Sequence, residues 1–399
     1  TLYSAQGEVA LQAGGAQTWQ PLTQGASLCA GDIVAVRRLS RAVLRLEQEQ
    51  TTIQLGENTT LVLPRIRVEG YSWVEILNGI THFISRVPRT LQIKTPFVNA
   101  AVEGTEFVVE VSNEEAQISV QEGTVRARAL SGDVVMQAGN VVRARSGQVP
   151  AEPAIEQTDQ RVNWALYYPQ ILEFEPEAFT RAGPQSWRAP AAESVRALKS
   201  SDIKTALSKL EEALSQSNDA DGAADTDFQL YRAQLLLLVG RIDEARTSID
   251  TARAVTPDAS SVWVLESLIA VTQNRFTQAM EHADKAAASD PRSSAAQLAR
   301  SYAFQARFEL DAALQAAGLA VDLNPNSALA WARLAEVRLM HGMLDAASAA
   351  ARRAVEINPQ SATAQTVLGF ASLTRGRTAE AIGSFEQAAR LNQASPWPR

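Results

Sequence analysis

Residues 328–361 read ALAWARLAEVRLMHGMLDAASAAARRAVEINPQS, and this stretch decides how the second half of the chain folds. Its pattern of small and apolar residues recurs on both sides at a fixed spacing of 34 residues. Prolines keep that spacing at Pro257, Pro291, Pro325 and Pro359. The apolar residues follow a helical period, and each proline ends a helix because it cannot continue one. The sequence therefore predicts helix pairs repeated along the chain.

Alanines mark two further positions of each unit, where two helices must approach each other closely. They are Ala245, Ala279, Ala313, Ala347 and Ala381, followed seven residues later by Ala252, Ala286, Ala320, Ala354 and Ala388. The predicted units are 226–259, 260–293, 294–327, 328–361 and 362–395, within a helical region that runs to residue 399. A degenerate helical pair is expected at 187–225, because residues 206–213 keep the spacing of a second helix. Since the last unit shows no polar capping helix, we expect the natural protein to continue.

The repeat resembles the tetratricopeptide (TPR) repeat, in which two helices make up about 34 residues. In the order of that motif the matching residues are Trp331, Leu334, Ala335, Ala347, Ala351, Ala354 and Pro359. The resemblance implies an all-α superhelical solenoid. It also implies a concave groove, lined by positions 2, 5, 9 and 12 of each first helix.

Positions 9 and 12 supply the candidate residues for a groove that binds a partner protein or peptide. They are Leu268, Val271, Tyr302, Gln305, Glu336, Leu339, Phe370 and Leu373. The lysine and asparagine clamp with which some family members hold a terminal carboxylate is missing, which disfavours that class of partner. Leu268, Tyr302 and Phe370 are predicted to form an apolar stripe that receives a peptide or a helix. Alternatively, they pack against the next repeat or against the amino-terminal half.

The first 147 residues alternate apolar and polar side chains in short runs, as in DIVAVR at 32–37 and EFVVEV at 106–111. Such alternation predicts half-buried strands. Clusters of Gly, Asn, Asp and Glu separate the runs at a spacing of roughly ten residues, which is typical of an all-β domain. No helical period interrupts them, which disfavours a parallel βαβ architecture.

The stretch TPFVNAAVEGTEFVV at 95–109 gives this region its resemblance to the FecR domain, an all-β module of bacterial envelope proteins. The resemblance covers nearly all of residues 1–147 and implies a sandwich or a solenoid-like β fold. Phe107 and Val109 are expected to share a buried face. FecR regulators that relay iron-siderophore signals place an anti-sigma segment and a membrane span before this domain. Here a solenoid follows the domain instead, so only the domain itself is carried over.

Residues 148–186 are predicted to be a linker with an aromatic docking segment. The linker part is polar and contains two prolines. The aromatic residues after it are Trp164, Tyr167, Tyr168, Phe174, Phe179 and Trp187. We expect them to dock the linker onto a neighbouring domain, and the alternative is an aromatic platform for a ligand.

Composition excludes several classes of function. The net charge of −7 disfavours a nucleic-acid partner, and charged residues interrupt every apolar stretch before it could span a membrane. One cysteine and three histidines leave little material for a metal site. No catalytic motif and no cofactor motif is found, so we predict no catalytic residues, no metal, no cofactor and no enzymatic activity.

These patterns favour a non-enzymatic interaction or scaffold module of a Gram-negative cell envelope or periplasm, with its signal peptide removed. The expected partner is a protein or peptide in the TPR groove, and an outer-membrane protein or an envelope glycan are further candidates. One alternative is the periplasmic part of an outer-membrane export or surface-assembly system for polysaccharide or protein. Another is FecR-type signalling from an outer-membrane transporter.

Overall fold

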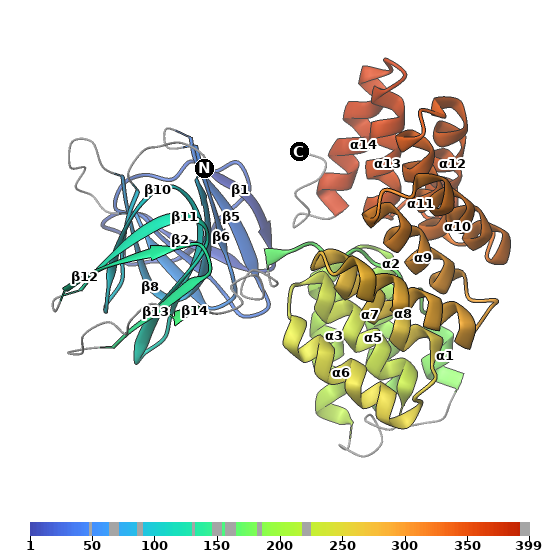
Figure 1. Cartoon of the computed structure of the whole chain (residues 1–399), viewed down its shortest axis with the longest axis horizontal. Coiled ribbons are helices and arrows are strands. Elements are labelled where there is room, and N and C mark those ends of the chain that lie inside the picture. Colours follow the sequence, from blue (N-terminus) through green and yellow to red (C-terminus); the bar gives the residue numbers. More distant parts are fainter. Residues whose placement is uncertain are drawn as a thin grey trace. The chain divides into compact units, whose positions relative to one another are not determined.

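The computed structural model describes residues 1–47, 50–63, 72–85, 91–129, 132–145, 154–155, 165–181, 186–217 and 225–391. The chain forms two compact units, residues 1–166 and residues 167–399. Figure 1 shows strands in the first unit and helices in the second. The predicted fold class, an all-β domain followed by a helical solenoid, is confirmed.

The strands of the β unit belong to one sheet, in the order β14-β13-β11-β10-β9-β8-β7-β4-β2-β3, with β1, β5, β6 and β12 attached beside this path. Among the described residues every pairing is antiparallel except that of β8 with β9. The strands are β1 Leu2–Gln6, β2 Val9–Gln12, β3 Gln20–Pro21, β4 Ile33–Val36, β5 Arg41–Leu46, β6 Thr51–Leu55, β7 Thr59–Val62, β8 Ser72–Ser85, β9 Leu91–Lys94, β10 Asn99–Val111, β11 Glu115–Ala129, β12 Gly132–Gln137, β13 Asn140–Arg145 and β14 Ala154–Ile155.

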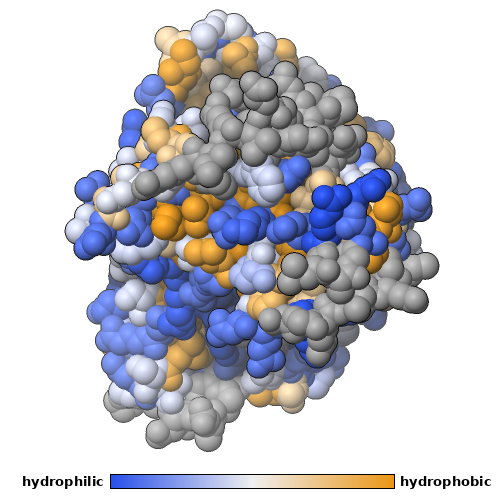
Figure 2. Space-filling model, turned by 90° about the vertical axis from the view of Figure 1, so that its left-hand side faces the viewer, coloured by the Kyte–Doolittle hydropathy of each residue, from blue (hydrophilic) through white to orange (hydrophobic). Residues whose placement is uncertain are grey.

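One hydrophobic core serves this sheet and includes residues of strands from β1 to β13. Phe107 and Val109 are fully buried in it, as their alternation predicts. The ring of Phe107 stacks on Phe83, with 4.9 Å between the ring centroids. Outside the core the strands carry polar residues, and Figure 2 shows hydrophilic and hydrophobic side chains interspersed on one face. That is the expected surface of a sheet with one solvated side.

One boundary of the β unit differs from the sequence prediction. Ala154 and Ile155, predicted to lie in the linker, form β14 and pair with Val141 and Asn140 of β13. The reason is that the edge of β13 offers unpaired backbone groups, which a short extended segment satisfies whatever its side chains are. Alternation cannot reveal a strand of two residues.

The helical unit contains the predicted helix pairs. Its helices in the described residues are α1 Pro176–Arg181, α2 Arg188–Lys199, α3 Ile203–Gln216, α5 Thr226–Leu238, α6 Ile242–Val255, α7 Ser260–Thr272, α8 Phe276–Ser289, α9 Ser294–Ala306, α10 Leu310–Leu323, α11 Ala328–Met340, α12 Leu344–Ile357, α13 Ala362–Leu373 and α14 Thr378–Leu391. The repeated alanines are at most 1% exposed, which confirms that they lie where helices meet closely.

Two local devices recur from unit to unit. Ser293, Ser327 and Ser361 each precede a first helix and accept a hydrogen bond from the backbone amide three residues later, as N-caps do. Serine hydroxyls also join the two helices of a pair, because Ser267 donates to the carbonyl of Ala279 and Ser301 to that of Ala313. These bonds join α7 to α8 and α9 to α10.

The pair α2–α3 is built like the later repeats. Ser194 on α2 donates to the carbonyl of Ala206 on α3, over the same interval of 12 residues. The turn after α2 also meets the far end of the solenoid, because Ser201 donates to the carbonyl of Gln360 at 2.6 Å. The superhelix therefore curves enough for its first pair to contact the turn before α13.

The aromatic residues before α2 divide into two groups. Tyr168, Phe179 and Trp187 are at most 1% exposed, and Phe179 and Trp187 pack against Phe228 of α5. Tyr167, in contrast, faces a groove of the solenoid. Trp164 lies outside the described residues.

Candidate functional site

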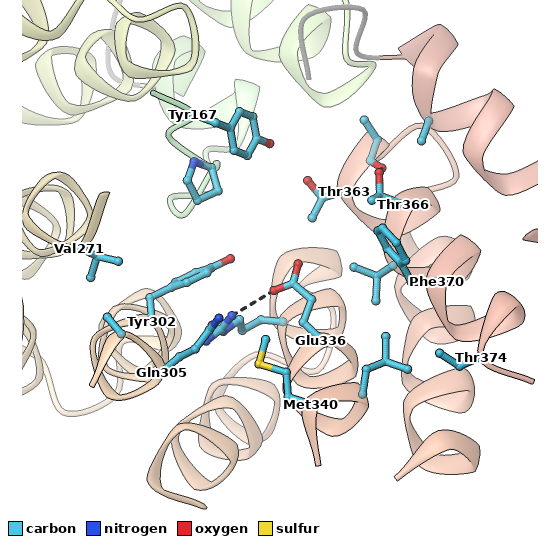
Figure 3. Close-up of a pocket in the computed structure, with 17 residues that line it drawn as sticks. Tyr167, Val271, Tyr302, Gln305, Glu336, Met340, Thr363, Thr366, Phe370 and Thr374 are labelled. Carbon is cyan, nitrogen blue, oxygen red and sulfur yellow. Dashed lines mark hydrogen bonds and ion pairs between the residues drawn. The ribbon is translucent and has the colours of Figure 1, made fainter. Parts of the chain in front are cut away.

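The concave side of the solenoid contains a hollow of about 690 Å³ between α7, α9, α11 and α13. Figure 3 shows its labelled side chains converging from these helices and from the segment before α1. It is lined by Tyr167, Pro169, Val271, Tyr302, Gln305, Ala306, Arg333, Glu336, Leu339, Met340, Ala362, Thr363, Thr366, Val367, Phe370, Thr374 and Ala388. Most of these side chains are apolar or neutral, so the hollow is suited to apolar groups.

A charged pair lies at the floor of the hollow. Arg333 is 2% exposed, and its guanidinium donates to Ser301 Oγ and to the Ser301 carbonyl, both at 3.0 Å. Its third bond, from Nη1, reaches Glu336 Oε2 at 3.1 Å and is the dashed line in Figure 3. The guanidinium carbon also lies 3.9 Å from the ring centroid of Tyr302. These contacts hold Arg333 in place and make it a fixed support for Glu336.

Glu336 remains accessible from the hollow, since its side chain is 28% exposed. The protein around it removes water from the carboxylate, and this burial raises the pKa of Glu336, while the neighbouring Arg333 opposes the rise. Oε1 of Glu336 makes no hydrogen bond with the described residues, whereas Oε2 binds Arg333. One carboxylate oxygen is thus available to a ligand.

Six of the eight predicted groove residues line the hollow: Val271, Tyr302, Gln305, Glu336, Leu339 and Phe370. The other two do not. Leu268 is 1% exposed and packed inside the solenoid, as the alternative interpretation allowed. Leu373 is 48% exposed and lies outside the hollow.

Several lining residues were not among the predicted set. Thr363 and Thr366 occupy positions 2 and 5 of their helix, so the groove positions of the repeat would have found them. Arg333 directly follows groove position 5 of its helix, so the spacing of the repeat does not mark it as a groove residue. Tyr167 and Pro169 come from outside the repeats, and only the tertiary fold brings them to the hollow.

The other end of the concave groove already holds part of the chain, which we name the inner segment (residues 167–173). Gln234, at position 9 of α5, accepts hydrogen bonds through Oε1 from the backbone amides of Ile171 at 3.0 Å and Leu172 at 3.1 Å. Gln273 donates to the hydroxyl of Tyr168 at 3.2 Å. The segment therefore occupies this end of the groove, where its backbone and its Tyr168 hydroxyl are bound by Gln234 and Gln273.

Two other kinds of site are absent from the part of the chain that the structure describes. No group of three His, Cys, Asp or Glu side chains is placed to hold a metal ion there. None of the helices described combines the length and the apolar character needed to cross a bilayer.

Comparison with known families identifies both units. The FecR protein family matches residues 32–126, and the tetratricopeptide repeat family matches residues 197–269, 264–328 and 333–396. The chain carries a FecR domain and a TPR solenoid. Both predicted resemblances are confirmed. The first TPR match begins within α2, so it includes part of the helical pair predicted to be degenerate.

Solved structures resemble each unit separately. For the FecR domain, a candidate anti-sigma factor from Parabacteroides distasonis is 17% identical, with a TM-score of 0.31, over 35% of this chain and 68% of that one. For the TPR solenoid, a thermophilic TPR protein from Thermus thermophilus is 23% identical, with a TM-score of 0.41, over 47% and 100%. A TPR protein from Parabacteroides merdae is 16% identical, with a TM-score of 0.39, over 54% and 85%. No curated protein matches the chain.

Proposed function

We propose that the chain is a non-enzymatic interaction module of a bacterial envelope protein, in which the TPR solenoid docks a protein or peptide in its concave groove. The observation that carries this proposal is the hollow, where six residues chosen from the repeat positions converge. Its volume of about 690 Å³ is enough for several side chains of an extended segment. The FecR match supports the envelope as the place of action.

A photocrosslinking amino acid placed at Gln305 tests the proposal in cells that produce the full chain. Gln305 lines the hollow, and its side chain makes no hydrogen bond with the described residues. We expect a crosslink to an envelope protein, identified by mass spectrometry. The matched control is the same amino acid at Leu373, which is exposed but lies outside the hollow. Equal crosslinking at both positions, or none at Gln305, would contradict the proposal.

A second candidate function is signalling, which the FecR match at residues 32–126 favours. In this hypothesis the FecR domain contacts an occupied outer-membrane transporter. The test is a transcriptional reporter in cells with the gene intact or deleted. A response to transporter substrate that is lost on deletion supports signalling, and an unchanged response rules it out.

A further inference from the structure

The inner segment shows how this groove binds a peptide backbone. Gln234 accepts from two consecutive amides with a single oxygen, while the side chains of Tyr168, Ile171 and Leu172 are at most 4% exposed. The carboxamide of a first-helix glutamine thus binds the main chain of the segment, and the segment's own apolar side chains are buried beside it. A segment of another protein can be held in the same way, by bonds to its main chain and by packing of its apolar side chains.

The hollow offers a carboxamide and an apolar wall that match these two features. Gln305 is half-buried, and its carboxamide makes no hydrogen bond with the described residues, so it can bind a backbone as Gln234 does. Leu339, Val367 and Phe370 form an apolar wall beside it. The ring of Phe370 is held by edge contact with Phe385, at 5.0 Å between ring centroids.

The charge available in the hollow is negative. Arg333 and Glu336 are the only residues with acidic or basic side chains among the described residues that line it. Arg333 is 2% exposed, and its guanidinium is engaged by Ser301 and Glu336. Glu336 is 28% exposed and presents Oε1 without a partner in the described residues. A carboxylate in confined surroundings gains from a cationic ligand, and an acidic ligand would place like charges together.

We propose that the hollow binds an extended segment of a partner protein in which a lysine or arginine pairs with Glu336 Oε1. A neighbouring aliphatic or aromatic side chain of that segment packs against Leu339 and Phe370. This inference rests on the proposed function and adds the chemical class of the partner.

The test uses the full chain, labelled with a fluorophore at Cys29, which is exposed and belongs to the β unit. The probes are decapeptides of Ser and Gly that carry one lysine or arginine at one, two or three residues from a leucine or phenylalanine. In matched peptides the basic residue is replaced by glutamine or glutamate. We expect the basic peptides to bind about tenfold more tightly than the glutamine peptides, as for a charged hydrogen bond.

The variant Glu336→Gln should lose this preference for basic peptides while keeping the binding due to the apolar residue. The peptide replacements test the same point on the unaltered protein, so the experiment holds even if the variant folds poorly. Binding without a basic preference, or a preference that survives in Glu336→Gln, overturns the inference and leaves the proposed function standing. No binding by any peptide overturns both. Tighter binding by a chain that lacks residues 392–399 would show that the chain's own end competes for the hollow, and overturns the choice of a partner segment.

Discussion

Position 9 of the first helix is Gln234 in unit 226–259 and Glu336 in unit 328–361, and the two lie in opposite halves of one groove. Gln234 is completely buried beneath the inner segment and binds two of its amides. Glu336 faces the hollow with one oxygen unbound in the described chain. The same repeat position therefore holds the chain's own backbone in one half and is open to a ligand in the other. Substitutions in the filled half and in the open half of the groove should therefore have different effects, and the predictions below compare them.

The largest effect is expected where a predicted groove residue is part of the core. Leu268→Ala should lower the free energy of unfolding by about 2–5 kcal/mol, because a fully buried leucine leaves a cavity. Leu373→Ala, at the exposed end of the same series of positions, should change it by less than about 0.5 kcal/mol. Urea denaturation measures both, and equal losses would show that burial does not distinguish them.

Gln234→Leu should lower the free energy of unfolding by about 2 kcal/mol or more, because the buried amides of Ile171 and Leu172 lose their acceptor. Hydrogen exchange at those two amides should become faster than in the unaltered chain. Gln305→Leu is the control in the open half and should change the free energy of unfolding by less than about 0.5 kcal/mol. A similar loss in both variants would mean that the inner segment does not depend on Gln234.

Substitutions in the turns between paired helices change stability and leave the groove intact. Gly240, Asn274, Phe308, Gly342 and Gly376 all have positive φ, the left-handed region that favours glycine. Phe308 is 88% exposed with φ 62°, so it bears the steric cost without a packing gain. Phe308→Gly should raise the free energy of unfolding by about 1 kcal/mol.

Gly342→Ala is the reverse change, at a turn with φ 71° and open space around it, and should lower the free energy of unfolding by about 1 kcal/mol. Thermal denaturation of both variants measures the pair. Destabilisation by Phe308→Gly would indicate that the phenylalanine ring makes a stabilising contact in solution.

The smallest expected effect is a pH dependence that comes from Glu336. Because burial raises its pKa in the folded chain, the folded state binds this proton more tightly than the unfolded state does. Its contribution to the free energy of unfolding is therefore greatest at low pH. The contribution declines as the pH rises from the ordinary glutamate pKa of about 4.3 through the raised value. The difference in unfolding free energy between the unaltered chain and Glu336→Gln, measured by urea titration at several pH values, should decline in the same direction. A difference that grows with pH would contradict the assignment.

Most of the helical fold is predictable from the sequence because its causes are local. The prolines end helices, and alanines such as Ala347 and Ala354 let two helices approach, whatever the rest of the chain does. The strands of the β unit follow from alternation for the same reason. The two-residue strand β14 escapes prediction because it depends on the free edge of β13 and not on its own side chains.

The candidate site is only partly predictable. The positions of the repeat point to Tyr302, Gln305, Glu336 and Phe370, which the structure brings together. The same positions also point to Leu268, which is buried, and to Leu373, which lies outside the hollow. Position along a helix fixes which side a residue is on, whereas the curvature of the superhelix decides whether that side is covered.

The sequence by itself determined the two kinds of unit, the 34-residue register and the helix face that lines the groove, because each follows from spacing between near neighbours. Only the tertiary structure decided which half of the groove the inner segment fills. Gln234 meets Ile171 across 63 positions of the chain, between a repeat and a segment that belongs to none. A periodic pattern cannot encode such a contact, since equivalent positions carry the same signal whether or not another part of the chain covers them.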